Sequence, residues 1–362
     1  MVDPQEVAGA ALRRPASAAR VIGRAPMAYD PFLAGRSVEH VEGTAEMAGG
    51  AVLRWTAIVK RTSGGGLRAA RRELSAYRAG IASAQPDSGL RGPALLAWMD
   101  ERDLVELWLE EVADDHGGAW PIERYGVAAH HIGSWNARTA LVTLPADFDS
   151  EDRWAERHGQ PDRVAEALDQ LGELVDVPAA AGVEGLLGRG AFERVAALIA
   201  STPRRLELLA LQPVTLLHHD LVRSNLFAIG DHQTVVIDWE NVGRGPLGVD
   251  LAPLVIGSVR RGEASSDDIA RLESVVLAGY TAGLRDAGVA DVGQVGEAYR
   301  LAVGLRWHVV LGTISALVRP ESAGFRGSRP AESRAEAMRH LVELSRHILD
   351  VGLASLDRHD PG

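Results

Sequence analysis

The sequence contains no cysteine, and this absence excludes two kinds of site. Without thiols the chain can form neither disulfide bonds nor zinc or iron–sulfur sites with thiolate ligands. A protein without disulfides fits a reducing compartment. The composition therefore predicts a cytoplasmic protein.

Long uncharged hydrophobic runs are also missing. The segment 1–20 begins with acidic side chains and holds no apolar stretch of signal-peptide length. The longest apolar stretch, Val295–Val318, is predicted as a helix, but Glu297, Arg300, Arg306 and His308 interrupt it. We therefore expect no membrane-spanning segment and no membrane partner.

Strong positive charge is a third absence. The formal net charge is −11 at pH 7, and no basic stripe with interleaved aromatic residues occurs, so we expect no nucleic-acid partner. A negative charge is compatible with a cationic substrate such as an amino sugar, because an acidic cleft attracts one.

Lysine is almost missing as well, and its one occurrence is informative. The 38 basic residues are arginines except for Lys60, which ends the alternating, strand-like run Trp55–Lys60 and lacks the flanking residues of a GxxxxGK[ST] phosphate loop. A glycine loop and an amphipathic helix follow, and Glu73 lies on that helix. The helix has apolar residues at three- and four-residue steps, at Leu67, Ala70, Leu74, Tyr77 and Ile81. Because the chain uses arginine at every other such position, a lysine here indicates that the site requires a compact ammonium group rather than a planar guanidinium.

Three side chains with oxygen ligands follow one another between residues 216 and 250, at Asp220, Asn225 and Asp238. Magnesium that binds nucleotide phosphates uses a few carboxylate or amide oxygens rather than a full protein cage. Phosphoryl transfer needs positioning and charge neutralisation, for which such a small set suffices. A single aspartate of this kind is more often a turn residue. The ordered set of three side chains instead predicts a magnesium-linked site, in which Asp220 accepts the attacking hydroxyl or orients it by hydrogen bonding.

A β-hairpin is expected to bring two of these residues together. Asn225–Ile229 and Thr234–Trp239 are predicted strands, and Gly230 with Asp231 forms a tight turn between them. Pairing of the strands would place the first residue of one strand close to Asp238, so that one metal ion contacts both.

These residues carry a family resemblance. His218-x-Asp220-x4-Asn225, followed by Ile237-Asp238-Trp239, resembles the signature of the aminoglycoside phosphotransferase and choline-kinase-like families, which are small-molecule kinases with a protein-kinase-like fold. The resemblance implies that Asp220 is the catalytic aspartate and that Asn225 and Asp238 bind magnesium. It also implies that His218 supports the catalytic loop.

The resemblance implies a two-lobed α+β fold. Residues 1–113 would form the nucleotide-binding lobe, with a small antiparallel sheet and one helix, and end in the hinge. Residues 114–362 would form a larger, mostly helical lobe with the catalytic loop, the magnesium site and the acceptor pocket. Asp250 looks structural and would tie its own loop to the catalytic loop.

The resemblance also assigns the nucleotide contacts. Lys60, held by Glu73, would clamp the α- and β-phosphates of ATP. The hinge candidates are Glu110, Glu111 and Val112, which would contact adenine through backbone groups. The segment Tyr29–Arg36 would cover the phosphates, but it has a single glycine where protein kinases use several, so a plain hairpin connection is the alternative.

The other expected elements fit this plan. Strands are expected at residues 20–27, 37–42, 51–60, 95–99 and 104–112, and helices at residues 122–137, 266–284, 295–318 and 331–356. Residues 151–201 are expected to hold at least two helices, broken at Pro161 and Pro178. Residues 1–18 would form a loosely attached lead-in or a short helix. His130 and His131 point in different directions on a helix, so no metal site is expected there.

The sequence therefore predicts an ATP- and Mg2+-dependent phosphotransferase that acts on a hydroxyl of a small molecule. The first expectation for the acceptor is an aminoglycoside or another glycoside-type antibiotic, and with it a role in resistance. The alternative is a primary metabolite, such as a sugar, choline or another amino alcohol.

Two further alternatives come from other classes of protein. A nucleotide-binding pseudokinase would lack Asp220, Asn225, Asp238 or Lys60, and all four are present. A protein-substrate kinase would need an activation segment with an APE-like ending, which the short run Glu240–Gly248 does not provide. The sequence leaves open the acceptor, the hydroxyl modified, the choice between ATP and GTP, and the oligomeric state.

Overall fold

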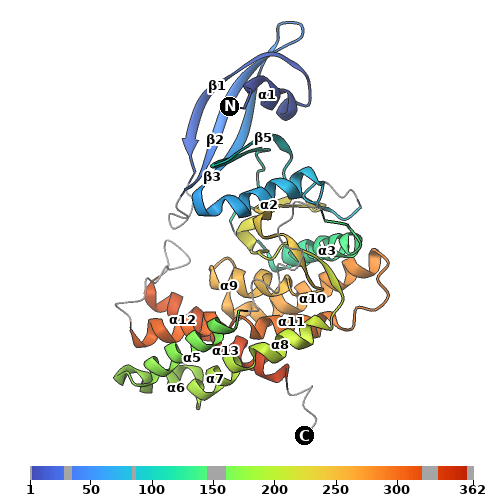
Figure 1. Cartoon of the computed structure of the whole chain (residues 1–362). Coiled ribbons are helices and arrows are strands. Elements are labelled where there is room, and N and C mark those ends of the chain that lie inside the picture. Colours follow the sequence, from blue (N-terminus) through green and yellow to red (C-terminus); the bar gives the residue numbers. More distant parts are fainter. Residues whose placement is uncertain are drawn as a thin grey trace.

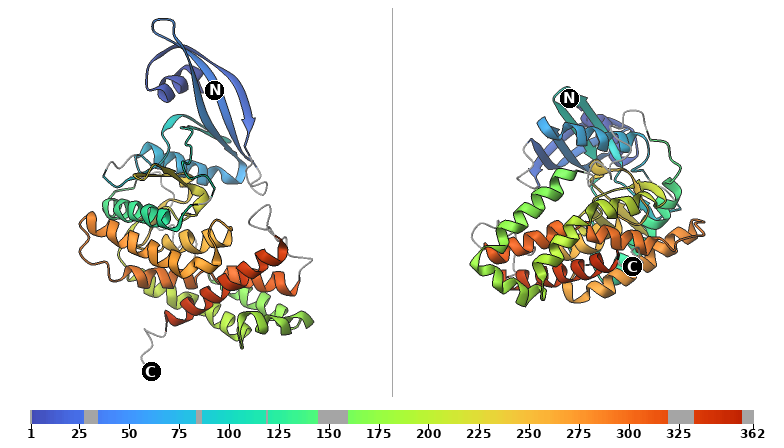
Figure 2. Two further views of the ribbon diagram at one scale, coloured as in Figure 1. Left: turned by 180° about the vertical axis from the view of Figure 1, so that it is seen from behind. Right: turned by 60° about the horizontal axis from the view of Figure 1, so that its bottom comes forward.

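The structure is a computed structural model of the whole chain, and it describes residues 2–27, 35–83, 87–118, 120–144, 160–319 and 333–356. Figure 1 shows two lobes, with a β-sheet at one end and a bundle of helices at the other. The view from behind in Figure 2 shows the same division. The predicted α+β fold with a sheet-containing lobe and a mostly helical lobe is confirmed.

The N-terminal lobe is built on a five-stranded antiparallel sheet with the strand order β1-β2-β3-β6-β5. Its elements are α1 (Pro4–Leu12), β1 (Ala16–Pro26), β2 (Arg36–Met47), β3 (Val52–Ser63), α2 (Leu67–Arg78), β5 (Leu95–Glu101) and β6 (Leu104–Leu109). The expected strands are all present, and several are longer than the sequence indicated. In the central pairing, Lys60 lies opposite Val38 on β2 and Leu107 on β6.

A helix covers each face of this sheet, because the strands alternate between two apolar cores. Leu74 and Tyr77 of α2 belong to one core, together with Leu107 of β6. Val7 and Ala8 of α1 are fully buried in the other core, whose strand residues include Trp55, Val59 and Trp108. The short helix predicted as one alternative for residues 1–18 is therefore correct, and a loosely attached lead-in is wrong.

The C-terminal lobe is mostly helical. Its helices are α3 (Ile122–Thr139), α5 (Pro161–Val175), α6 (Ala181–Leu187), α7 (Ala191–Ala200), α8 (Thr202–Ala210), α9 (Ser258–Arg260), α10 (Ile269–Asp286), α11 (Val295–Gly304), α12 (Trp307–Val318) and α13 (Arg334–Ala354). Its strands are β7 (Val214–Leu217), β8 (Leu226–Ile229), β9 (Gln233–Val236) and β10 (Gly243–Pro246), and β4 (Leu90–Arg91) pairs with β9 in parallel.

One helix prediction needs correction. Pro161 begins α5, because the missing N–H of proline costs nothing in the first turn, and residues 151–159 before it lie outside the described ranges. The stretch Val295–Val318 is not one helix, since α11 ends at Gly304 and α12 begins at Trp307. This stretch is apolar enough to cross a membrane by composition alone, but 67% of its most apolar window is buried inside the protein.

The closest helix contact in the C-terminal lobe joins α3 and α10 through glycines. A Cβ atom added to Gly279 would lie 2.1 Å from the carbonyl oxygen of Gly126, and one added to Gly283 would lie 1.9 Å from that of His130. Side chains at these positions would push the two helix backbones apart. The contact positions α3, whose side chain Asn136 donates to the Leu216 carbonyl on β7, the strand that leads into the predicted catalytic loop.

Gly283→Ala is expected to lower the free energy of unfolding by about 1–3 kcal/mol, because the added methyl group has no space between the helices. The matched control is Gly172→Ala on α5, where nothing lies within 4 Å of an added Cβ. This control should be neutral or slightly stabilising, since alanine favours a helix more than glycine does. Denaturant unfolding of the two variants measures the difference, and equal stability would contradict the close contact.

Candidate functional site

The single lysine meets the glutamate predicted to hold it. Lys60 lies near the end of β3 and Glu73 on α2, and Lys60 Nζ lies 2.7 Å from Glu73 Oε2. Lys60 is 8% exposed and Glu73 is fully buried. The strand, glycine turn and helix therefore bring the two residues together as the sequence indicated.

Lys60 has a second partner that links the two lobes. Its ammonium group also donates to Asp238 Oδ1, which comes from the segment after β9. Burial opposes ionisation of Asp238, but the positive charges of Lys60 and Arg36 and the hydrogen bond from Lys60 hold the pKa of that carboxyl below its usual value. Asp238 is therefore an ionised carboxylate paired with a cation.

Glu73 has the opposite shift. Its burial raises the pKa to about 7, Lys60 counteracts this, and the carboxylates of Asp238 and Glu240 add to the rise. A buried carboxyl near two others takes up a proton more easily, since the neutral form needs no solvation. Its charge therefore changes close to neutral pH.

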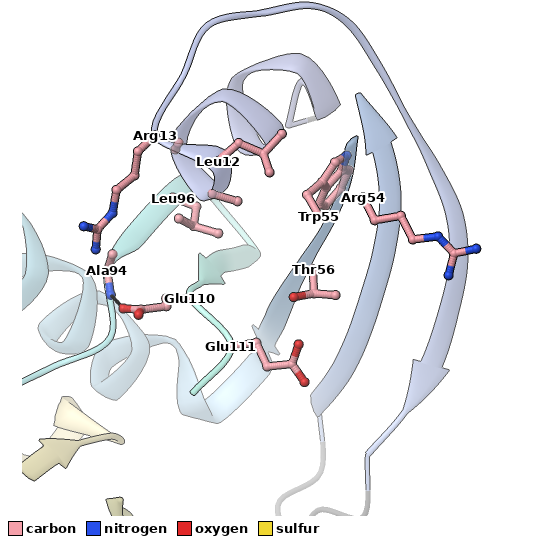
Figure 3. Close-up of a pocket in the computed structure, with 11 residues that line it drawn as sticks. Leu12, Arg13, Arg54, Trp55, Thr56, Ala94, Leu96, Glu110 and Glu111 are labelled. Carbon is pink, nitrogen blue, oxygen red and sulfur yellow. Dashed lines mark hydrogen bonds between the residues drawn. The ribbon is translucent and has the colours of Figure 1, made fainter. Parts of the chain in front are cut away.

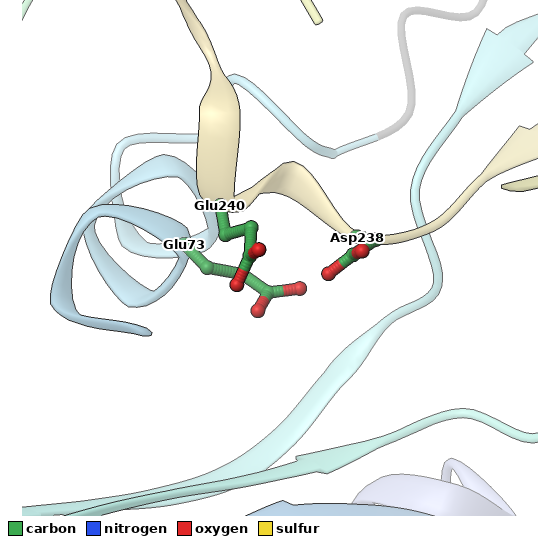
Figure 4. Close-up of side chains that lie close together, drawn as sticks. All are labelled: Glu73, Asp238 and Glu240. Carbon is green, nitrogen blue, oxygen red and sulfur yellow. The ribbon is translucent and has the colours of Figure 1, made fainter. Parts of the chain in front are cut away.

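Glu240 completes a group of three carboxylates that sequence reasoning missed. Figure 4 shows Glu73 on α2, and Asp238 and Glu240 on the segment after β9, with their carboxylates close together. One oxygen of each lies within 4.8 Å of the others, so among the described residues they form a candidate metal group. Arg36 Nη1, at the start of β2, lies 2.6 Å from Glu240 Oε2. Lys60 and Arg36 thus offset part of the negative charge of this group. The position of Glu240, two residues after Asp238, was the available signal in the sequence.

The predicted catalytic loop, residues 218–225, is held at its start by hydrogen bonds to a buried carboxylate. Asp250 accepts hydrogen bonds from the backbone N–H of His218 at 2.7 Å and of His219 at 2.9 Å. These bonds fix His219 in a left-handed conformation with φ of 66°. Asp250 therefore ties its loop to the catalytic loop, as predicted.

His218 supports the loop from inside. Its Nε2 lies 3.0 Å from the carbonyl of Ile237, and the N–H of Asp220 lies 3.3 Å from its Nδ1. Burial lowers its pKa despite the nearby carboxylates of Asp220 and Asp238. A neutral imidazole with its proton on Nε2 satisfies both contacts, and it joins Asp220 to the segment that carries Asp238.

Asn225 and Asp220 are in direct contact. Asn225 Nδ2 donates to the carbonyl of Asp220 at 2.9 Å and to its Oδ2 at 3.3 Å. The carbonyl of Asn225 accepts the N–H of Ile237 at 3.0 Å, so the hairpin brings Asn225 beside the segment that leads to Asp238.

The predicted strand ends need correction. Asn225 lies in the short 3-10 turn Arg223–Asn225 before β8, and β9 ends at Val236. Asp238 has a left-handed backbone, with φ of 67°, so it does not continue the pleated face of β9. The left-handed residue turns the chain after the strand, and its side chain meets Lys60 as a result.

A cleft of about 470 Å3 lies between the lobes. The residues that line it come from both lobes: Met27, Val38, Ile58, Lys60, Glu73, Pro93, Leu109, Glu110, Glu111, Val112, Ser224, Asn225, Phe227, Ile237, Asp238 and Arg261. Apolar side chains form one part and the charged groups another, which suits a flat heterocycle joined to phosphates.

The hinge candidates Glu110, Glu111 and Val112 line this cleft. The N–H of Glu110 donates to the Ala94 carbonyl at 2.9 Å, and its carboxylate binds Arg91 at 2.6 and 3.0 Å. Burial opposes ionisation, but the hydrogen bonds from Arg91 and from the Ala94 N–H hold the pKa of Glu110 below its usual value. The side chain and the N–H of Glu110 are therefore both held by partners within the protein.

A second hollow, of about 300 Å3, lies beside Glu110 and Glu111 (Figure 3). It is lined by the end of α1, by Arg54–Thr56 of β3 and by the side chains of Glu110 and Glu111. Helix α1 is therefore part of the surroundings of the hinge.

Other predictions concern residues outside the site or outside the described ranges. The expected phosphate-covering segment Tyr29–Arg36 lies outside the described residues except for Gly35 and Arg36. His130 Nε2 lies 2.8 Å from Asp286 Oδ2, and His131 Nδ1 lies 3.0 Å from the hydroxyl of Thr234. The two histidines therefore have separate hydrogen-bond partners.

Comparisons with known proteins agree with this geometry. Residues 135–285 match the model of the phosphotransferase enzyme family. The structure is similar to an aminoglycoside phosphotransferase from Alicyclobacillus acidocaldarius, with a TM-score of 0.55 and 15% identity over 92% of each chain. It is also similar to the amicoumacin kinase hAmiN in complex with AMP-PNP and Ca2+, with a TM-score of 0.52 and 12% identity over 90% of this chain and 88% of the other. No curated protein matches the sequence.

Identities this low show a shared fold, whereas the family match covers the helix before the catalytic loop, the loop itself and the segment with Asp238. The match over residues 135–285 and the shared fold confirm the resemblance found in the sequence, and they support a small-molecule kinase.

Proposed function

We propose that this kinase transfers the γ-phosphate of ATP to a hydroxyl group of a small molecule, with the nucleotide in the cleft between the lobes. The observation that carries the proposal is that Lys60, Asp238, Asn225 and Asp220 come from separate elements and meet at this cleft. Three of the four line the cleft, and Asp220 is in contact with the third, Asn225.

Each charged residue has a proposed task. Lys60, oriented by Glu73, binds the α- and β-phosphates of the nucleotide. To do so, its ammonium group must leave Asp238 and contact the phosphates instead. Glu110, Glu111 and Val112 hold the base through backbone groups. Asp220 orients the acceptor hydroxyl for in-line attack and accepts its proton, and neutral His218 holds the backbone of Asp220.

Asn225 and Asp238 fit a magnesium ion by their chemistry. Asp238 is an ionised carboxylate, and Asn225 commits its amide nitrogen to Asp220, so its amide oxygen remains as a ligand. When bound, Mg2+ supplies positive charge against the phosphates. Glu240 is held by Arg36 and is not needed in this set.

The proposed acceptor is an aminoglycoside or another glycoside-type antibiotic. The net charge of −11 supports a cationic amino sugar, and the fold is shared with an aminoglycoside phosphotransferase. A sugar, choline or another amino alcohol is the alternative. We place the lobe boundary at residues 113 and 114, directly after the hinge.

A nucleotide-consumption screen tests the proposal. The panel contains aminoglycosides, macrolides, nucleoside antibiotics, sugars and amino alcohols, each with ATP and with GTP, and Asp220→Asn serves as the inactive control. Turnover with an aminoglycoside or another glycoside-type antibiotic is expected. Wild-type consumption equal to that of Asp220→Asn across the panel would identify a pseudokinase, and peptide phosphorylation alone would identify a protein kinase.

Glu73 should give the reaction a pH dependence near neutrality. Below its pKa of about 7 the buried carboxyl is protonated and loses the charge that orients Lys60, whereas Asp238, whose pKa is lowered, stays ionised. We expect kcat/KM for ATP, which reports on the free enzyme, to rise with pH and level off above about 7. Glu73→Gln should be slower and lack this rise beyond the ionisation of ATP itself. Identical profile shapes for the two proteins would contradict the assignment.

A further inference from the structure

We propose that Arg223 and Asp114 are positioning residues that fix the catalytic loop to the segment after the hinge. Arg223 lies in the loop between Asp220 and Asn225, and Asp114 lies two residues after Val112. The inference rests on the proposed function, because it concerns the placement of the residues that act on the nucleotide.

The guanidinium of Arg223 is buried among fixed partners. Arg223 is 5% exposed, and its Nη1 donates to the Leu226 carbonyl at 2.7 Å. Its Nη2 donates both to Asp114 Oδ2 and to the Gly117 carbonyl. The guanidinium also lies over the ring of Trp120, at 4.1 Å from the centroid. Planar, multidentate contacts of this kind fix direction as well as distance.

Asp114 receives donors from both sides of this junction. Its Oδ1 accepts the N–H of Ala228 on β8 at 3.1 Å, the N–H of His116 at 3.2 Å and Trp120 Nε1 at 3.3 Å. The next residue continues the attachment, since the N–H of Asp115 donates to the Ala228 carbonyl at 3.0 Å and its carboxylate accepts the N–H of Gly230 at 2.6 Å. The segment after the hinge is thus bound along β8.

The Arg223–Asp114 contact sets the distance between the hinge and the catalytic loop, and this distance matters for the reaction. The hinge would hold the base of the nucleotide, whereas Asp220 and Asn225 would meet the other end of the same ligand. The Arg223–Asp114 pair is the buried ionic contact between the two chain segments that carry these groups. A displacement of about 1 Å in a reacting geometry lowers a rate by roughly 100-fold.

The Arg223–Asp114 pair is suited to fixing the position of the catalytic loop more than to stabilising the fold. A buried ion pair adds little net stability compared with apolar residues of similar size. Arg223 donates to Asp114 and Gly117, whereas the next two residues, Ser224 and Asn225, line the cleft. Arg223 therefore acts through its neighbours and is not a group that touches the nucleotide.

The test compares Arg223→Lys, Arg223→Met and Asp114→Asn with the wild type. Lysine keeps the charge but cannot reproduce the planar fork, so kcat should fall roughly 10- to 100-fold in all three variants. The dissociation constant for ATP, measured by equilibrium binding, should change less than about threefold. The double variant Arg223→Met/Asp114→Asn should be little slower than either single one, because both changes break the same contact.

The control is Arg244→Met, which removes a half-buried arginine that also donates to carbonyl groups, those of Ala140 and Val142. Its kcat, normalised to ATP-binding sites, should equal that of the wild type. A wild-type kcat in Arg223→Lys, or a loss of ATP binding parallel to the loss of kcat, would overturn the positioning role.

Amide hydrogen exchange tests the inference without a measurement of turnover. Arg223→Lys should speed exchange in residues 218–226 and leave α10 unchanged. If the wild type turns over no acceptor, the proposed function fails while this measurement still decides the inference. Unchanged exchange in the catalytic loop would refute the attachment.

Discussion

Asp220→Asn is expected to lower kcat by roughly 10²- to 10⁴-fold with little change in the affinity for ATP, because it removes the only proposed base for the acceptor hydroxyl. The asparagine keeps the size of the side chain and leaves the Asn225 bond to the Asp220 carbonyl intact. It also leaves intact the N–H that meets His218, so the loop should keep its shape. Steady-state turnover and equilibrium ATP binding measure the two effects separately.

Asp231→Asn is the matched control for this experiment. Asp231 is the exposed residue in the turn between β8 and β9, with the same chemistry and no part in the cleft. It should keep wild-type kcat. An Asp220→Asn variant with more than about a tenth of the wild-type kcat would refute the role of Asp220 as base.

Lys60→Arg is expected to lower kcat/KM for ATP by roughly 10²- to 10³-fold, although it preserves the charge. The ammonium fits between Glu73 and Asp238 in a site where the side chain is 8% exposed, and the larger planar guanidinium has no room there. The control is Arg61→Lys on the same strand, since Arg61 faces Glu39 and Glu106 instead of the cleft. Equal activity of Lys60→Arg and the wild type would contradict the need for a compact cation.

The single lysine permits a direct second measurement of this site. An amine-reactive reagent can modify only Lys60 and the terminal amino group. ATP with Mg2+ should slow modification of Lys60 and leave the terminus unaffected, as peptide mass spectrometry would show. A modification rate of Lys60 that is insensitive to the nucleotide would place the phosphates elsewhere.

The sequence predicted most of the site because its key residues follow a fixed order along the chain. The spacing of Lys60 and Glu73 on a strand and the next helix, and that of Asp220, Asn225 and Asp238 around a hairpin, was enough to bring them together. Strand alternation and helix periodicity likewise predicted the sheet and the main helices, with errors at their ends.

The missed features depend on contacts between distant residues. Nothing in the local pattern around Arg223 indicates that it meets Asp114, 109 residues away, or that Arg36 meets Glu240. The left-handed backbone of Asp238 was missed because a β-branched run predicts a continuing strand, whereas the contact with Lys60 favours a turn. The break between α11 and α12 was missed because an apolar run has no local stop signal when both halves are buried.

The placement of α1 has a practical consequence for handling this protein. A version shortened to begin at β1 would expose the apolar face around Trp55 and Val59 to water, which favours aggregation. The end of the same helix also lines the hollow beside Glu110 and Glu111. A shortened version of the protein should therefore keep α1, because this helix both covers the apolar face and borders the segment of Glu110 and Glu111.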